Sequence, residues 1–143
     1  MKANQETEIA AMNVINQFAE AFARRDLKAM MALYAPDPDV VAIGTGGDEK
    51  RIGPADIKAL FERDFAQFED ASLEVGRHSV SAAGSVAWVA ADAIVHTDTG
   101  DRRINLPVRL TVVLERRGDR WFIVQFHGST PAAGQKEGEA FPT

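Results

Sequence analysis

The sequence contains no cysteine, and this absence excludes disulfide bonds, thiolate nucleophiles and cysteine-ligated metal sites together. Histidine is also scarce. Its three copies, His78, His96 and His127, fall on separate predicted strands and show no metal-ligand spacing such as H-x-x-x-H. Neither a G-x-x-x-x-G-K-[ST] phosphate loop nor a G-x-S-x-G nucleophile elbow occurs. We therefore expect no bound metal, no cofactor and no hydrolase triad.

An excess of basic charge and long apolar runs are lacking as well. The chain has 16 lysines and arginines against 21 aspartates and glutamates, a formal net charge of −5, which gives a nucleic-acid partner no electrostatic support. No apolar run approaches the length of a membrane span, and the start, MKANQETEIAAMN, lacks the apolar core of a signal peptide. We interpret the chain as a cytoplasmic protein with neither a nucleic-acid nor a membrane partner.

The remaining composition is that of an ordinary globular domain. The chain has 143 residues, of which 45% are hydrophobic and 26% charged, so it can bury a sizeable core. No internal repeat or interdomain linker is visible. The last residues, TPAAGQKEGEAFPT, are small and polar. We therefore predict one domain over residues 1–131 and a flexible tail over residues 132–143.

The first half of the chain has the apolar spacing of helices. Between residues 7 and 24, apolar side chains recur every three or four positions, and polar side chains occupy the opposite side. Asp26 is placed to cap a second, shorter helix, which the following prolines end. Gly53-Pro54 then begins a third helix, with proline at the favoured first position.

The second half of the chain is rich in strands. The apolar run VVAI at residues 40–43 predicts a first strand, and Arg51-Ile52 predicts its short partner across a glycine-bearing turn. From Leu73 onward the apolar residues alternate, and turn sequences separate four longer segments. These four predicted strands lie near residues 73–80, 85–96, 104–116 and 120–128. Helices followed by a largely antiparallel sheet make an α+β domain.

The final strand, in RWFIVQFHGSTP at residues 120–131, is the most informative one for function. On a regular strand, one face would carry Trp121, Ile123, Gln125 and His127. The opposite face would be wholly apolar. Both faces begin apolar, which is typical of a strand buried on two sides. One face then ends in an amide and an imidazole, so a polar function for this end of the strand has to be considered.

Three stretches resemble a known family: FARRDLKAMMALYAPD, IGTGGDEKRIGPADI and RLTVVLERRGDRWFIVQFHGS. They look like the SnoaL-like branch of the nuclear transport factor 2-like superfamily, close to the calcium/calmodulin-dependent kinase II association domain, over roughly residues 8–131. The resemblance implies a cone-shaped barrel, in which a curved, mostly antiparallel sheet packs against about three helices and encloses a pocket. It also implies a homodimer through the sheet. The superfamily includes isomerases, cyclases, dehydratases, binding proteins and assembly modules, so it predicts the fold more closely than the chemistry.

Two departures from the relatives bear on mechanism. The last strand matches the family pattern W-x-I-V-H-x-H-x-S except that Gln125 stands where the first histidine is common. Because an amide cannot take up a proton at neutral pH, a mechanism with two imidazoles is disfavoured. Ketosteroid-isomerase relatives carry a general-base aspartate on the first strand, whereas VVAIG holds no acid. Proton abstraction of that type is disfavoured too.

Asp64 is the strongest candidate for a catalytic residue. On a helical wheel it falls between Leu60 and Phe68, inside the apolar stripe of the third helix. A carboxylate on a buried stripe must find partners or take a raised pKa, which suits a general base or a group that orients a ligand. The alternative is a residue at the rim, bonded to nearby backbone or to an arginine.

His127, Gln125 and Arg109 are further candidates, each with a structural alternative. His127 could act as an acid, a base or a hydrogen-bond donor, or be a structural histidine at the end of a strand or at an interface. Gln125 is predicted on the same face. Arg109 could bind an anionic ligand, or pair with Glu115 or with an acid at an interface, and we favour the pairing.

Two aromatic residues and a pair of acids complete the candidates. Trp88 could form an aromatic wall near an acid, although a place in the core is favoured. Tyr34 could point its hydroxyl inward or simply anchor packing at the end of the second helix. Asp48 and Glu49, in the turn TGGDEK, lie near the expected mouth of the cone, but paired acids in such a turn are usually solvated.

Two functions remain open. In the first, the protein binds or transforms a small, mostly apolar molecule as a cofactor-independent isomerase, cyclase or dehydratase would, with Asp64, His127 and Gln125 as polar contacts. In the second, it is a non-catalytic module that self-associates through its sheet. A buried acid among aromatic residues supports the first function, and the likeness to the kinase association domain supports the second.

Overall fold

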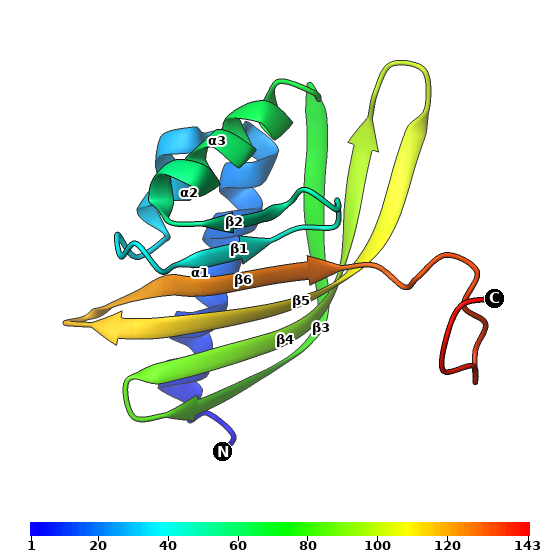
Figure 1. Ribbon diagram of the computed structural model, residues 1–143. Coiled ribbons are helices and arrows are strands. Elements are labelled where there is room, and N and C mark those ends of the chain that lie inside the picture. Colours follow the sequence, from blue (N-terminus) through cyan, green and yellow to red (C-terminus); the bar gives the residue numbers. More distant parts are fainter.

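The computed structural model describes residues 1–143 as three helices packed on one side of a six-stranded sheet (Figure 1). The helices are α1 (Gln5–Arg24), α2 (Leu27–Ala32) and α3 (Pro54–Phe65). The strands are β1 (Val41–Ile43), β2 (Lys50–Ile52), β3 (Asp70–Ala83), β4 (Val86–Asp98), β5 (Arg103–Arg117) and β6 (Arg120–Ser129). Their order is β2-β1-β6-β5-β4-β3, and only β1 and β6 are parallel. The predicted α+β fold is confirmed, with an open, curved sheet in place of a closed barrel.

The helices begin and end at the residues that local chemistry favours. Asn4 caps α1, where its side-chain oxygen accepts a hydrogen bond from the Thr7 amide at 2.8 Å. The helix ends at Arg25, which takes a left-handed conformation. Asp26 then caps α2 as predicted, since its carboxylate accepts from the Ala29 amide at 3.0 Å. Pro54 occupies the first turn of α3.

The sheet bends because one of its long strands contains a bulge. Val75 of β3 pairs with Ala93 of β4, but the next pair joins His78 to Ala91, so two residues on β3 oppose one on β4. A bulge of this kind bends and twists the strand that carries it. In Figure 1 the first half of β3, the last half of β4 and the first half of β5 rise toward the level of α3. The sheet therefore curves around the helices and leaves space between them.

A second bulge, at Val124 in β6, divides the face that we predicted for the final strand. Val113 of β5 pairs with Gln125, whereas Leu114 pairs with Ile123, so Val124 has no partner. Ile123 is fully buried against the helices, and Gln125 is exposed on the other side. The predicted face is therefore split: Trp121 shares a side with Ile123, whereas Gln125 and His127 lie together on the other side. A period-two reading cannot foresee an inserted residue.

The core lies between the helices and the inner face of the sheet. Its largest fully buried side chains come from both layers: Met30, Val40, Ile57, Val89, Val112, Leu114 and Ile123. We call the opposite side of the sheet, turned away from the helices, the outer face. No helix is long and apolar enough to cross a membrane. After β6 the chain forms no further helix or strand and extends away from the domain (Figure 1).

Candidate active site

A cavity of about 160 Å³ lies between the inner face of the sheet and helices α1 and α3. We call it the cone cavity. Its walls are mostly apolar. The phenylalanine and leucine side chains that line it include Phe18, Phe22, Leu60, Phe61, Leu110 and Phe126. Phe18 and Phe126 stack with their ring centroids 4.5 Å apart. The polar side chains on its wall are those of Tyr34, Thr45, Glu49 and Asp64. The space is thus an apolar chamber with a few acceptor groups.

Asp64 lines the cone cavity, as its position on the helical wheel predicted. Its side chain is 32% exposed, and its carboxylate lies 3.3 Å from the Nε of the neighbouring Arg63. Burial raises the pKa of Asp64, and the charge of Glu49 raises it further, whereas Arg63 acts in the opposite direction. An acid with a raised pKa is closer to the pH at which a general base or acid works best.

Tyr34 supplies the second polar group of the chamber. The residue is 4% exposed, and its hydroxyl is the single buried side-chain polar atom without a hydrogen-bond partner. Burial raises the pKa of this hydroxyl, so it stays protonated and able to donate. An unpartnered buried hydroxyl costs free energy, and a molecule in the cavity could satisfy it.

Glu49 also lines the cone cavity, near the mouth where we expected it, but it is more buried than we predicted. Its side chain is only 20% exposed and accepts a hydrogen bond from the Gly46 amide at 3.2 Å. The prediction that it is a solvated turn residue is wrong. The glycines of the turn were the available signal, because a Cβ at Gly44 would lie 2.0 Å from the Glu49 carboxylate. Because Gly44 and Gly46 have no side chain, the Glu49 carboxylate can fold back over the turn.

Arg63 connects the acids at the entrance of the cavity. Its guanidinium contacts Asp48 at 2.6 Å, Glu49 at 3.2 Å and Asp64 at 3.3 Å. The pKa of Asp48 is lowered, chiefly by its hydrogen bond to Arg63. The arginine stands on the exposed side of α3, directly before Asp64, and so joins that helix to the turn between β1 and β2.

His127 and Gln125 do not reach the cone cavity. The bulge at Val124 places Phe126 and Gly128 on the cavity wall and turns the alternate residues to the outer face. There Gln125 pairs with Val113, and His127 pairs with Thr111. Their predicted contact with a molecule inside the cone is therefore not available in this structure.

Arg109 and Trp88 lie on the outer face as well. Trp88 is half-buried, and it stands between the core residues Ala87 and Val89 on the opposite side of the strand, so its predicted place in the core is wrong. Of the two pairings that we favoured for Arg109, the one with Glu115 does not form, and Arg117 contacts that acid at 3.2 Å. The pairing with an acid at an interface stays a prediction. Sheet alternation separates both residues from the cone cavity.

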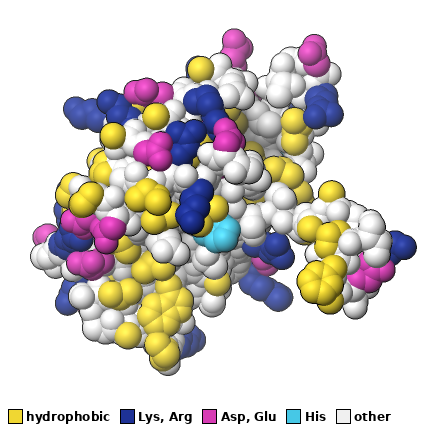
Figure 2. All heavy atoms as spheres, in the orientation of Figure 1, with side chains coloured by type: hydrophobic (Ala, Val, Ile, Leu, Met, Phe, Trp, Pro, Cys, Tyr) yellow, Lys and Arg dark blue, Asp and Glu magenta, His cyan; other side chains and the backbone are white.

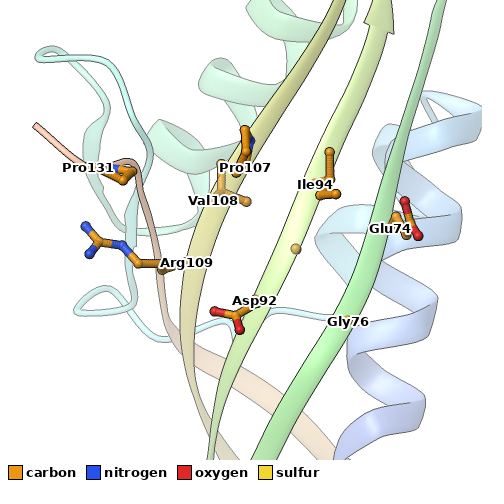
Figure 3. Close-up of a pocket in the computed structure, with 9 residues that line it drawn as sticks. Glu74, Gly76, Asp92, Ile94, Pro107, Val108, Arg109 and Pro131 are labelled. Carbon is orange, nitrogen blue, oxygen red and sulfur yellow. The ribbon is translucent and has the colours of Figure 1, made fainter. Parts of the chain in front are cut away.

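Arg109 instead borders a shallow groove of about 270 Å³ on the outer face, which we call the outer groove. Asp92 lies opposite Arg109 in the β4–β5 register, and no ion pair joins them. Figure 3 shows the Arg109 side chain extended away from Asp92, with Glu74 and Pro131 at the sides of the groove. No group of three or more acidic or histidine side chains is placed to hold a metal ion. Three of the nine residues that line the outer groove are hydrophobic, against twelve of the seventeen that line the cone cavity.

Comparison with solved structures identifies proteins that share the fold. A candidate dehydratase of the nuclear transport factor 2-like family from Streptomyces avermitilis superposes with a TM-score of 0.82 at 20% identity, covering 91% of this chain and all of that one. A candidate aromatic ring hydroxylase from Novosphingobium aromaticivorans gives 0.82 at 19% identity, covering 92% and 93%. A candidate calcium/calmodulin-dependent protein kinase II association domain from Xanthomonas campestris gives 0.76 at 22% identity, covering 92% and 91%.

The sequence itself supplies the assignment. These identities are low, so the solved structures establish the shared fold and not a shared activity. Among curated proteins, none matches the chain significantly. The model of the SnoaL-like domain, however, matches residues 11–133, which include every helix and strand except the first turns of α1. The chain belongs to the SnoaL-like domain family, and it shares its fold with structures described as nuclear transport factor 2-like.

Proposed function

We propose that this protein binds a small, mostly apolar molecule in the cone cavity, with Asp64 and Tyr34 as its polar contacts. One observation carries the proposal: an acid with a raised pKa and an unpartnered buried hydroxyl line the same apolar chamber. Both features cost stability in the empty protein, and both would be relieved by a ligand with polar groups of its own.

The same two groups fit a cofactor-independent proton transfer, such as an isomerisation, a cyclisation or a dehydration. Asp64 would take a proton from the bound molecule, because its raised pKa brings it toward neutral pH. The Tyr34 hydroxyl would donate a hydrogen bond to an oxygen on which negative charge develops. The apolar walls would exclude water and strengthen both interactions. The fold shared with a candidate dehydratase is consistent with this chemistry.

Blocking the cavity tests the binding proposal. Gly128 lines the cavity, and a Cβ there would meet only Leu110 at 3.4 Å and Phe126 at 3.7 Å, which are ordinary contacts. The Cβ of Gly128→Val should therefore fit without straining the strand, and its two methyl groups should occupy part of the cavity. We expect benzyl alcohol, titrated by calorimetry or by NMR shifts, to bind the wild type and to lose most of its affinity for this variant.

Thr111→Val is the matched control, because it places the same side chain on the exposed outer face of the neighbouring strand. It should bind benzyl alcohol as the wild type does. Equal affinity of Gly128→Val and the wild type would place the ligand elsewhere and reject the cone cavity. No binding to the wild type by any member of a panel of small aromatic and aliphatic alcohols would reject the proposal altogether.

Self-association through the outer face is a second candidate function, which we propose on a separate observation. None of the three helices covers that face, and it carries Trp88 and Val113 in one row beside Gln125. Half-exposed tryptophan is typical of residues that anchor interfaces. Figure 2 shows apolar, acidic and basic side chains interspersed over the visible surface, which suits a mixed interface.

We expect a homodimer that buries at least ~1,000 Å² in total. Sedimentation velocity at micromolar concentration should give about twice the chain mass of 15.6 kDa. Val113→Asp should shift the protein to the monomer, because a charge in the centre of the row would be desolvated in the dimer. Deletion of residues 132–143 should leave the dimer intact. A monomer for the wild type would reject this second function and leave the ligand proposal untouched.

A further inference from the structure

The entrance of the cone cavity carries more negative than positive charge. Asp48, Glu49 and Asp64 contact one guanidinium, that of Arg63, so two negative charges remain uncompensated within this group. The charge of Arg51 also acts on Asp48 and Asp64, but this arginine is paired with Asp56 at 3.0 Å, so the two further charges offset each other. A charged group entering the cavity therefore meets a negative field.

The wall of the cavity carries no positively charged side chain that could pair with an anionic ligand. No lysine, arginine or histidine contributes to its wall. The charged side chains that do, Glu49 and Asp64, only accept hydrogen bonds when they are ionised. The buried Tyr34 oxygen, which has no partner, can accept as well as donate. The polar side of the chamber is thus built for a ligand that donates.

The apolar walls favour a cation for an independent reason. Phe18, Phe22, Phe61 and Phe126 present aromatic rings to the same space. The negative face of an aromatic ring attracts an ammonium group, and the attraction grows when water is excluded. An organic cation would then gain from both the acidic entrance and the aromatic lining.

We propose that the ligand of the cone cavity is a small apolar molecule with a primary amine, whose ammonium group is held by Asp64 and Glu49. This inference rests on the proposed function and specifies the class of molecule. The ammonium offers three donors to the two carboxylates and the Tyr34 oxygen, and its hydrocarbon body packs on the phenylalanine rings. A carboxylate-bearing analogue would face like charges and lose its solvation without compensation.

Three probes of one shape test the inference: benzylamine, benzyl alcohol and benzoate, titrated into the wild-type protein by calorimetry at pH 7. We expect benzylamine to bind at least about tenfold more tightly than benzoate, with benzyl alcohol between them. Glu49→Gln keeps an acceptor in place but removes a charge. It should reduce the preference for benzylamine over benzyl alcohol by about threefold or more.

Asp48→Asn is the matched control, because Asp48 contacts Arg63 without lining the cavity. It should change the amine preference less than Glu49→Gln does. If benzyl alcohol binds and Gly128→Val blocks it, but benzoate binds as tightly as benzylamine, the inference is overturned while the proposed function stands. An amine preference that survives Glu49→Gln unchanged overturns the role of Glu49. Failure of all three probes to bind the wild type overturns the proposed function as well.

Discussion

Arg63 Nη2 lies 3.2 Å from Glu49 Oε1, so one guanidinium on α3 holds the turn between β1 and β2 over the cone cavity. The same group contacts Asp48 and Asp64. An arginine shared by three acids reduces their mutual repulsion, although its own exposure limits the energy of each pair. Ion pairs therefore stabilise the entrance of the cavity, whereas apolar packing stabilises its other walls.

Arg63→Gln should destabilise the protein modestly. The three acids lose their common partner, and we expect a small but measurable fall in the free energy of unfolding at pH 7 and low salt. The loss should shrink at high salt, where charge interactions are screened. Lys58→Gln, one turn away and 3.9 Å from its only partner Glu62, is the control and should leave stability unchanged. A salt-independent loss in Arg63→Gln would contradict the ionic explanation.

Asp64→Asn should leave the fold intact and make it more stable relative to the wild type as the pH rises. The pKa of Asp64 is raised, so the folded state binds this proton more tightly than the unfolded state. The resulting stability is present below the unfolded pKa of about 3.9 and is lost as the pH rises through the folded value. Asparagine removes this loss.

The measurement is the melting temperature of Asp64→Asn and wild type at several pH values between 4 and 7. The melting temperature of the variant should rise relative to that of the wild type as the pH approaches 7. The variant should also bind benzylamine and benzyl alcohol more weakly. Glu62→Gln, on the solvated side of α3, should show neither effect. A clear drop in melting temperature for Asp64→Asn with unchanged ligand affinity would show that Asp64 is a structural ion-pair partner.

Tyr34→Phe should stabilise the empty protein. The substitution removes a buried hydroxyl without a partner and keeps the ring that packs beside Phe61. We expect a gain of about 1 kcal/mol in the free energy of unfolding, measured by urea denaturation. The same variant should bind benzyl alcohol more weakly. Lower stability would indicate that the hydroxyl is already satisfied, and unchanged affinity would remove Tyr34 from the ligand contacts.

Asp37→Asn should make the free energy of unfolding less dependent on pH in the acidic range. Asp37 accepts a hydrogen bond from Arg117, which lowers the pKa of this carboxyl. Its contribution is present above the unfolded pKa of about 3.9 and is lost as the pH falls through the lowered folded value. The variant should therefore be less stable than the wild type at pH 7, and the two should converge toward pH 3. Asp39→Asn, two residues on and without an ion pair, should track the wild type throughout.

The sequence predicted every helix and strand, because their signals are local. Asp26 and Pro54 mark helix starts through capping and a fixed backbone angle, and period-two alternation marks the long strands. Asp64 was found for the same reason, since its place on the wheel of α3 depends only on its neighbours along the chain. These features need no knowledge of what lies across the sheet.

The features that sequence reasoning missed depend on tertiary structure. The bulge at Val124 moves Gln125 and His127 to the outer face, and an inserted residue leaves no mark in the apolar pattern. Trp88 was placed in the core because it is large and apolar, whereas its neighbours Ala87 and Val89 fill that side. Because successive residues of a strand alternate between its faces, the burial of Ala87 and Val89 on the inner face places Trp88 on the outer face.

A crystal structure of the protein grown with 4-bromobenzyl alcohol tests the cone cavity most directly, because anomalous scattering locates the bromine without ambiguity. We predict a bromine peak in the cone cavity among the phenylalanine rings, with the ligand hydroxyl at the other end of the molecule within hydrogen-bond distance of the Asp64 carboxylate or the Tyr34 oxygen. A peak confined to the outer groove beside Arg109, or no peak at all, would contradict the assignment of the cone cavity as the ligand site.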